Sequence, residues 1–182
     1  MNKNKPTITI VIDTREQLEY KGFSPNIETI HSTLPAGDYS LLGRETEVAI
    51  ERKSLDDFVQ TVINQRDRFR KELKKLQTYN SACIIVEASA DNIIPVLMCP
   101  RSNASPAAVW GATMSIIVDY GIPIYFLANR QIACKFVEDY LTRYYNRIIR
   151  ARREETTPEK KQRAREAVNE LLPPELRLPL CK

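Results

Sequence analysis

The chain has 182 residues, of which 43% are hydrophobic and 27% are charged, and its 27 Lys and Arg residues exceed its 23 Asp and Glu residues by a formal charge of +4. These values lie near the averages of soluble globular proteins and exclude a disordered or collagen-like chain. The longest near-apolar stretch, 107–118, is shorter than the about 20 residues that span a membrane, and the apolar run near the start is too short for a secretory signal. We expect no membrane partner and an intracellular protein, in the cytoplasm or nucleoid if the source is a prokaryote or phage.

Strands and helices alternate along the sequence, as hydrophobic periodicity and terminal signals indicate. Residues 7–12 are mostly β-branched, which is typical of a strand buried on both faces of a sheet. The expected strands are 7–12, 27–33, 39–42, 48–51, 81–87 and 124–127. One expected helix begins at Ser54, and four more are expected over 67–77, 105–119, 130–152 and from 157 toward 172. This alternation predicts an α/β fold with a mixed or parallel sheet covered on both faces. We expect a compact domain over 1–150 and a basic, helical or loose extension over 151–182.

Basic residues concentrate in two segments. Residues 66–75 hold six basic and two acidic side chains, and residues 143–165 hold nine basic and three acidic side chains. Clustered arginine suits the phosphate backbone of a nucleic acid, but solvated helices carry similar charged faces. Either run alone supports both explanations equally. The candidate DNA-binding residues are Arg66, Arg68, Arg70, Arg150, Arg152 and Arg153, to which Arg15 is added below.

Cysteine and histidine offer little metal-binding chemistry. The four cysteines are widely spaced without a C-x-x-C pair, and His31 is the one histidine. We expect a buried free thiol at Cys83, which lies in an apolar run, and no structural zinc site.

An acidic and basic pattern in the first third of the chain carries the chemistry. Asp38 follows Gly37, and a Glu-Arg-Lys triplet begins thirteen residues later at Glu51. Side chains alternate along a strand, so Glu51 and Lys53 share one face while Arg52 points to the other. Two carboxylates beside an ammonium suit magnesium-dependent phosphodiester hydrolysis, because the acids hold the cation and the lysine orients water and neutralises developing charge. The same residues could instead form an ordinary surface ion-pair set.

Three longer motifs resemble the XPF/Mus81 (ERCC4-type) nuclease domain family. They are Val11–Glu16, Leu34–Tyr39 and Ile50–Phe58, which match the family's V-D-x-R-E strand end and its G-D-x(n)-E-R-K-x-x-x-D pattern. The last aspartate of that pattern is Asp57 here. Further similarity, near a tryptophan-containing helix and the strand after it, extends the resemblance over about Thr7–Tyr145.

The resemblance implies a restriction-endonuclease-like fold, in which helices flank a central mixed sheet. It also implies cleavage of branched, forked or flapped DNA in repair or recombination, with Mg²⁺ or Mn²⁺ as cofactor. A homodimer through the nuclease domain is a further expectation. Core packing is the default explanation for the apolar helix around Trp110, but the resemblance implies that part of this helix could contact a second nuclease domain. The implied metal ligands are Asp13, Asp38 and Glu51, and the implied catalytic residues are Asp13, Arg15, Glu16, Asp38, Glu51, Arg52, Lys53 and Asp57.

Three of these residues have a second explanation. Ser54 and Asp57 also match a capping box, so Asp57 could only hold a helix start. Arg52 could pair internally with an acid such as Asp57 and support the site rather than act in it. Arg15 could clamp a phosphate bidentately or merely balance the acids.

One departure from the family bears on the substrate. No glycine follows Gly121, although the helix-hairpin-helix module common in the family needs glycine to bring backbone amides close to phosphate. We therefore expect a nuclease domain with only a basic extension, which weakens the expectation of branch selectivity. The alternatives are a catalytically silent DNA-binding or scaffold subunit of a nuclease heterodimer, and a nuclease for RNA or simple duplex ends. The complete set of motif acids, with Lys53, favours an enzyme.

Overall fold

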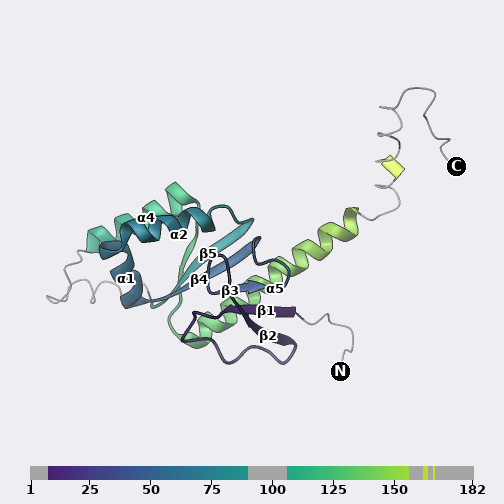
Figure 1. Cartoon of the computed structure of the whole chain (residues 1–182), viewed down its shortest axis with the longest axis horizontal. Helices are drawn as coiled ribbons and strands as arrows, with labels where there is room; N and C mark the ends of the chain where they lie inside the picture. The colour runs from purple at the N-terminus through teal and green to yellow at the C-terminus, as the bar shows by residue number, and fades with distance from the viewer. Residues whose placement is uncertain (1–7, 90–105, 156–161, 164–165, 167–182) are drawn as a thin grey trace. The chain divides into compact units, whose positions relative to one another are not determined.

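The structure is a computed structural model (Figure 1), and it describes residues 8–89, 106–155, 162–163 and 166. The chain divides into two compact units, Met1–Thr142 and Arg143–Lys182. The helix expected from 157 toward 172 lies almost entirely outside the described residues, and the domain boundary near 150 stays a prediction. None of the helices in the described ranges combines the length and apolar composition needed to cross a bilayer.

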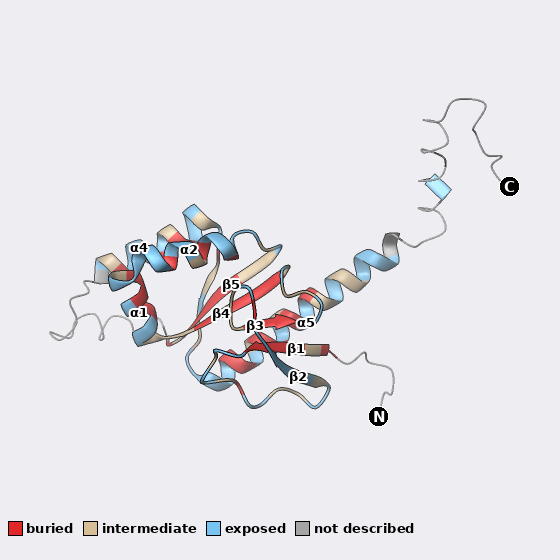
Figure 2. Cartoon of the chain, viewed as in Figure 1, coloured by how far each residue is buried: buried red, intermediate tan, exposed pale blue. Residues whose placement is uncertain are grey.

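The strands of the first unit form one mixed sheet in the order β2-β1-β3-β4-β5-β6. Strand β1 pairs in parallel with β2, the pairs β1–β3 and β3–β4 are antiparallel, and β4–β5 and β5–β6 are parallel. Buried residues fill β1, β4 and β5, whereas β2 is a largely exposed edge (Figure 2). The strand bounds are Ile8–Asp13 (β1), Ile27–Ser32 (β2), Tyr39–Leu41 (β3), Val48–Ser54 (β4), Ser81–Glu87 (β5) and Ile124–Phe126 (β6).

Helices cover both faces of this sheet, as predicted. The helix bounds are Leu55–Asn64 (α1), Arg66–Leu76 (α2), Pro106–Tyr120 (α4) and Arg130–Glu155 (α5). Helices α1, α2 and α4 pack against one face of β4 and β5, in a core that contains Phe58, Leu73 and Ile84. The first turns of α5 lie on the opposite face, where Val137 is buried and the Tyr140 hydroxyl lies 2.8 Å from Ser81 Oγ.

Two residues fix the backbone next to β4: Ser54, which begins α1, and Gly37, which lies in the turn before β3. Ser54 caps α1, because its Oγ accepts a hydrogen bond of 3.1 Å from the Asp57 backbone N–H. Gly37 has a φ of +76°, and a Cβ there would lie 3.0 Å from the Ile50 carbonyl oxygen. Only glycine fits both the left-handed backbone and the close approach. Gly37 therefore allows the close approach that brings Asp38 directly beside β4.

Candidate active site

Strand β4 carries the central charged residues on alternate faces. Glu51 and Lys53 lie on the face of α1 and α2, where Lys53 Nζ is 2.9 Å from Glu51 Oε1 and 5.2 Å from the ring centroid of Phe69. Arg52 points to the opposite face and binds Glu87. This arrangement confirms the alternation predicted from the period of two residues in a strand.

Asp38 lies beside Glu51 because both its backbone and its carboxylate are hydrogen-bonded to the backbone of β4. The Asp38 backbone N–H donates to the Ile50 carbonyl at 2.8 Å, and the Arg52 N–H donates to Asp38 Oδ2 at 2.7 Å. Burial, and then the negative charge of Glu51, hold the pKa of Asp38 well above its usual range, although the Arg52 N–H opposes this shift. The two acids therefore repel each other where they meet, which a bound cation would relieve.

Lys53 remains a cation in this setting. Burial by itself would lower the pKa of Lys53, but the charge of Glu51 and its hydrogen bond outweigh that effect, so the pKa is raised above its usual value. A protonated ammonium cannot accept a proton from water. Lys53 therefore carries a positive charge that can stabilise negative charge, and its catalytic role stays a prediction.

The loop after β1 contributes a second charged pair. Arg15 donates to both oxygens of Asp13, through Nε to Oδ1 at 2.7 Å and through Nη2 to Oδ2 at 2.9 Å. Asp13 is 1% exposed and also accepts from the Leu34 backbone N–H. Burial would raise the pKa of Asp13, but these bonds hold it below its usual value. The structure gives Asp13 the contacts of a residue that holds Arg15, and its role as a metal ligand stays a prediction.

These residues surround one cavity of about 360 Å³. Seven of the eight catalytic candidates line it, Asp13 being the exception. The motifs had not indicated five further lining residues, although Gln17 and Leu18 directly follow the first motif and Gln60 and Thr61 lie one helical turn after Asp57. The lining residues are Arg15, Glu16, Gln17, Leu18, Asp38, Glu51, Arg52, Lys53, Asp57, Gln60, Thr61 and Gln65.

The structure shows the contacts of Asp57 and Arg52, for each of which the sequence left two explanations open. Asp57 belongs to the cap of α1, with its Oδ2 accepting from Ser54 Oγ at 2.7 Å, and it also lines the cavity. Arg52 does pair internally with an acid, but the suggested partner, Asp57, is wrong, because the partner is Glu87. The guanidinium lies on the other face of the sheet, where Nε and Nη2 each donate to Glu87 at 2.8 Å, and Nη1 is 3.6 Å from Glu16.

The donor set of the cavity fits a hard divalent cation. Across the described residues, no group of three or more His, Cys, Asp or Glu side chains is arranged as a metal site. Magnesium, however, is commonly held by one or two carboxylates, with substrate phosphate and water completing the octahedron. Asp38 and Glu51 offer two such carboxylates in the same cavity, where burial and then the charge of Glu51 raise the pKa of Asp38 although Lys53 lies beside them.

The candidate DNA-binding arginines occupy α2 and the end of α5. On α2, Arg66 Nε donates to the Val62 carbonyl, whereas Arg68 and Arg70 are exposed and pair with acids on their own helix at 3.2 Å and 3.5 Å. Such exposed pairs contribute little to stability and leave the arginines available to phosphate. The remaining three, Arg150, Arg152 and Arg153, are exposed on the last turns of α5 and belong to the second unit.

The mixed sheet and the cavity beside β4 define an α/β domain of the restriction-endonuclease-like class. The family model of the ERCC4 domain matches residues 12–140. That match covers more than half of the sequence, and the chain therefore belongs to the ERCC4 domain family.

Comparisons with individual proteins agree with this class. The chain is 35% identical over 127 residues to the "Putative ATP-dependent RNA helicase" of Methanocaldococcus jannaschii, spanning 70% of this chain but only 14% of that protein. Among solved structures it resembles XPF from Aeropyrum pernix, with a TM-score of 0.56 and 21% identity over 74% of this chain and 60% of that one. The same protein in complex with DNA gives a TM-score of 0.58 and 22% identity over 77% and 66%. This confirms the predicted restriction-endonuclease-like fold.

Proposed function

We propose that this chain is a metal-dependent DNA endonuclease that hydrolyses phosphodiester bonds in the cavity beside β4. The observation that carries the proposal is the meeting of Asp38, Glu51 and a protonated Lys53 in one open cavity. Membership of the ERCC4 domain family supports it, as does the likeness to an XPF structure determined in complex with DNA.

Each residue has a role that its contacts support. Asp38 and Glu51 would hold Mg²⁺ or Mn²⁺, which when bound polarises the scissile phosphate and lowers the pKa of a coordinated water. Lys53 stabilises the charge that develops on the phosphoryl oxygens. Arg15 is fixed through Nε and Nη2 by Asp13, and its side chain remains 68% exposed at the cavity, where it can bind a substrate phosphate.

Branched, forked or flapped DNA, as formed in repair and recombination, is the proposed substrate. The arginines of α2 and of the end of α5 would bind the phosphate backbone, which fixes position but not sequence. A catalytically silent subunit would not need the acids of the cavity close together. Asp38 and Glu51 nevertheless lie close together, although their charges repel each other, and this favours an enzyme.

A homodimer through the nuclease domain is the proposed assembly. Helix α4 exposes Trp110, Met114, Ile117 and Val118, the last of them 76% exposed. Exposed apolar residues grouped on one helix mark an interaction surface. Light scattering at several concentrations tests this: we expect a dimer that Val118→Asp dissociates, and a concentration-independent monomer would refute it.

A cleavage panel tests the proposed activity. Matched fork, 3′-flap, linear-duplex, single-stranded DNA and RNA substrates are incubated with the native chain in Mg²⁺, Mn²⁺ or EDTA. Asp38→Ala serves as the blank, and Asp56→Ala, an exposed acid on α1 that does not line the cavity, as the matched control.

We expect metal-dependent cutting of the branched DNA by the native chain and by Asp56→Ala, and none by Asp38→Ala. Binding without cutting of any substrate would favour the silent DNA-binding subunit. Preferential cutting of RNA or of linear duplex would refute the proposed substrate.

A further inference from the structure

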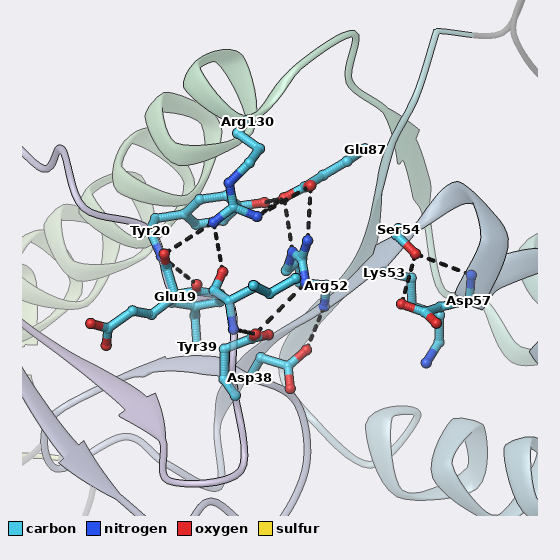
Figure 3. Close-up of polar contacts among 12 residues, drawn as sticks. Glu19, Tyr20, Asp38, Tyr39, Arg52, Lys53, Ser54, Asp57, Glu87 and Arg130 are labelled. Atoms are coloured by element: carbon cyan, nitrogen blue, oxygen red, sulfur yellow. Dashed lines mark hydrogen bonds and ion pairs between the residues drawn. The ribbon is translucent and has the colours of Figure 1, made fainter.

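Behind the cavity, Glu87 at the end of β5 joins three elements of the first unit (Figure 3). Its carboxylate accepts two hydrogen bonds of 2.8 Å from Arg52 on β4, one of 2.7 Å from the Tyr20 hydroxyl, and two of 3.1 Å and 3.3 Å from Arg130 Nη1 on α5. Arg52 and Glu87 are 6% and 10% exposed, so the pair is buried. A buried carboxylate that accepts donors from several elements fixes them relative to one another.

Arg130 extends this cluster to the loop after β1. Its Nη2 donates to the backbone carbonyls of Leu18 at 2.7 Å and Glu19 at 3.0 Å, and its guanidinium carbon lies 5.0 Å from the ring centroid of Tyr20. One guanidinium thus joins the Glu87 carboxylate to two successive peptide groups. The planar fork of arginine permits this arrangement, which the single ammonium of lysine cannot reproduce.

The loop held by Arg130 forms one wall of the cavity. Residues 15–18 of this loop line the cavity together with Lys53 and Asp57. Within the loop, the Leu18 N–H donates to Glu16 Oε1 at 2.6 Å, and that oxygen lies 3.6 Å from Arg52 Nη1. The wall is therefore held from behind by two arginines that share one carboxylate.

We propose that Arg130 is a positioning residue for cleavage, which sets the place of the 15–18 wall relative to Asp38 and Glu51 through the carbonyls of Leu18 and Glu19. This inference rests on the proposed nuclease function. Arg130 does not line the cavity, so it acts through the loop and not on the substrate. Displacement of a substrate-binding wall by about 1 Å can slow a reaction by one to two orders of magnitude.

The test compares single-turnover cleavage by Arg130→Ala, Arg130→Lys and the native chain at saturating protein. The matched control is Lys135→Ala, which also removes one positive charge from α5 but from an exposed side chain paired with Asp139. We expect Arg130→Ala to lower the rate constant about tenfold, or about 1.4 kcal/mol, with the DNA Kd within about twofold of native. Arg130→Lys should recover part of the loss, and Lys135→Ala should match the native chain.

Chemical rescue separates positioning from folding. Arg130 is 44% exposed, so methylguanidinium at about 10 mM can reach the space that Arg130→Ala leaves. At that concentration it has a negligible effect on stability. We expect it to raise the rate of Arg130→Ala at least threefold and to leave Lys135→Ala unchanged. A native rate in Arg130→Ala, or a slowed variant that methylguanidinium does not rescue, would overturn the proposal.

Hydrogen exchange distinguishes failure of this inference from failure of the proposed function. If the native chain cleaves nothing, the nuclease proposal fails, but faster amide exchange over residues 16–20 in Arg130→Ala than in Lys135→Ala still shows that Arg130 holds the loop. Equal exchange in the two variants would refute the positioning role.

Discussion

The two faces of β4 carry charge in opposite ways. On the cavity face, Glu51 and Asp38 approach each other with Lys53 as their neighbouring cation, and the pKa of Asp38 is raised by burial and by that repulsion. On the far face, Arg52 and Glu87 are buried and bidentately paired. Burial would raise the pKa of Glu87, but the bonds from Arg52 and Tyr20 hold it below its usual value.

The two faces of β4 thus differ in how their charges are compensated, within the seven residues of one strand. The cavity face keeps acids that repel each other and are available to a cation, at a cost in stability. The far face neutralises its charges and fixes the loop and helix around the site. Stability is commonly sacrificed where a site must hold reactive groups close together. Substitutions on the two faces should therefore differ in kind, which the following predictions test.

The largest expected effect is on catalysis, at the cavity face. Lys53→Ala should lower the single-turnover rate of DNA cleavage by about 1,000-fold, because a preorganised donor for the developing charge is removed. The DNA Kd, measured by fluorescence anisotropy, should change less than about threefold. A large loss of affinity with the rate retained would show that Lys53 binds DNA and takes no part in the reaction.

The next effect is on stability, at the far face. Glu87→Ala leaves the buried Arg52 guanidinium without its two hydrogen bonds to Glu87 and with only Glu16, 3.6 Å away, as an acidic neighbour, which should lower the free energy of unfolding in urea by about 3 kcal/mol. Glu87→Gln keeps acceptor atoms and should lose less. Glu28→Ala, on the exposed edge strand β2, is the control and should stay within about 0.5 kcal/mol of native. A Glu87→Ala variant as stable as this control would contradict the account.

A smaller effect of opposite sign is expected for Asp38→Asn in metal-free buffer. Because the folded-state pKa of Asp38 lies above its unfolded value, the native state keeps this proton where the unfolded chain has lost it. Its contribution to stability is therefore full below about pH 4 and declines as pH rises through the folded pKa. Asparagine does not titrate, so Asp38→Asn should be more stable than native by about 1 kcal/mol at pH 8 and by less at pH 4.

Asp13→Asn provides the reverse case in the same urea titrations. The folded-state pKa of Asp13 is lowered, so its contribution is present above the unfolded value and is lost as pH falls. Asp13→Asn should therefore be destabilised by a nearly constant amount from pH 8 to about pH 4, with a deficit that shrinks as pH falls further toward the folded-state pKa. Parallel pH profiles for the two variants would show that the contrast between these acids is wrong.

The smallest effect concerns salt. Replacing Arg68 and Arg70 on α2 by glutamine should reduce the slope of log K against log salt by up to about 0.9 for each phosphate that these side chains neutralise in the native chain. Binding titrations between low and moderate salt measure this slope. An unchanged slope would mean that these exposed arginines only solvate the helix.

Local sequence patterns predicted the helices, the strands and the residues on the cavity face of β4. The contacts of Arg52, Asp13 and Arg130 depend on how distant segments pack, which local patterns do not contain. The alternation of Glu51 and Lys53 is a property of any strand, Ser54 caps the helix that directly follows it, and Gly37 acts through its own backbone, so the sequence suffices for them. The partner of Arg52 depends on the register of β4 with β5, which pairs Arg52 with Ile85 and so places Glu87 two residues on, on the same face. No short-range pattern contains that register.

Asp13 shows the same limit from another side. It ends β1, as predicted, but β3 lies between β1 and β4 in the sheet. The Asp13 carboxylate is hydrogen-bonded to Arg15 and to the Leu34 N–H, and it does not line the cavity. Arg130 is similar, because its contacts join residues 111 and 112 positions apart.

The central claim is that the carboxylates of the cavity face hold the metal used in cleavage. Its most direct test is the rate of cleavage of the preferred DNA as Mn²⁺ is raised from zero, for the native chain and for Glu51→Gln. We expect no cleavage in EDTA, a saturable rise in rate for the native chain, and for Glu51→Gln a need for at least about tenfold more Mn²⁺ or no cleavage at all. Cleavage in EDTA, or the same Mn²⁺ dependence in both proteins, would contradict it.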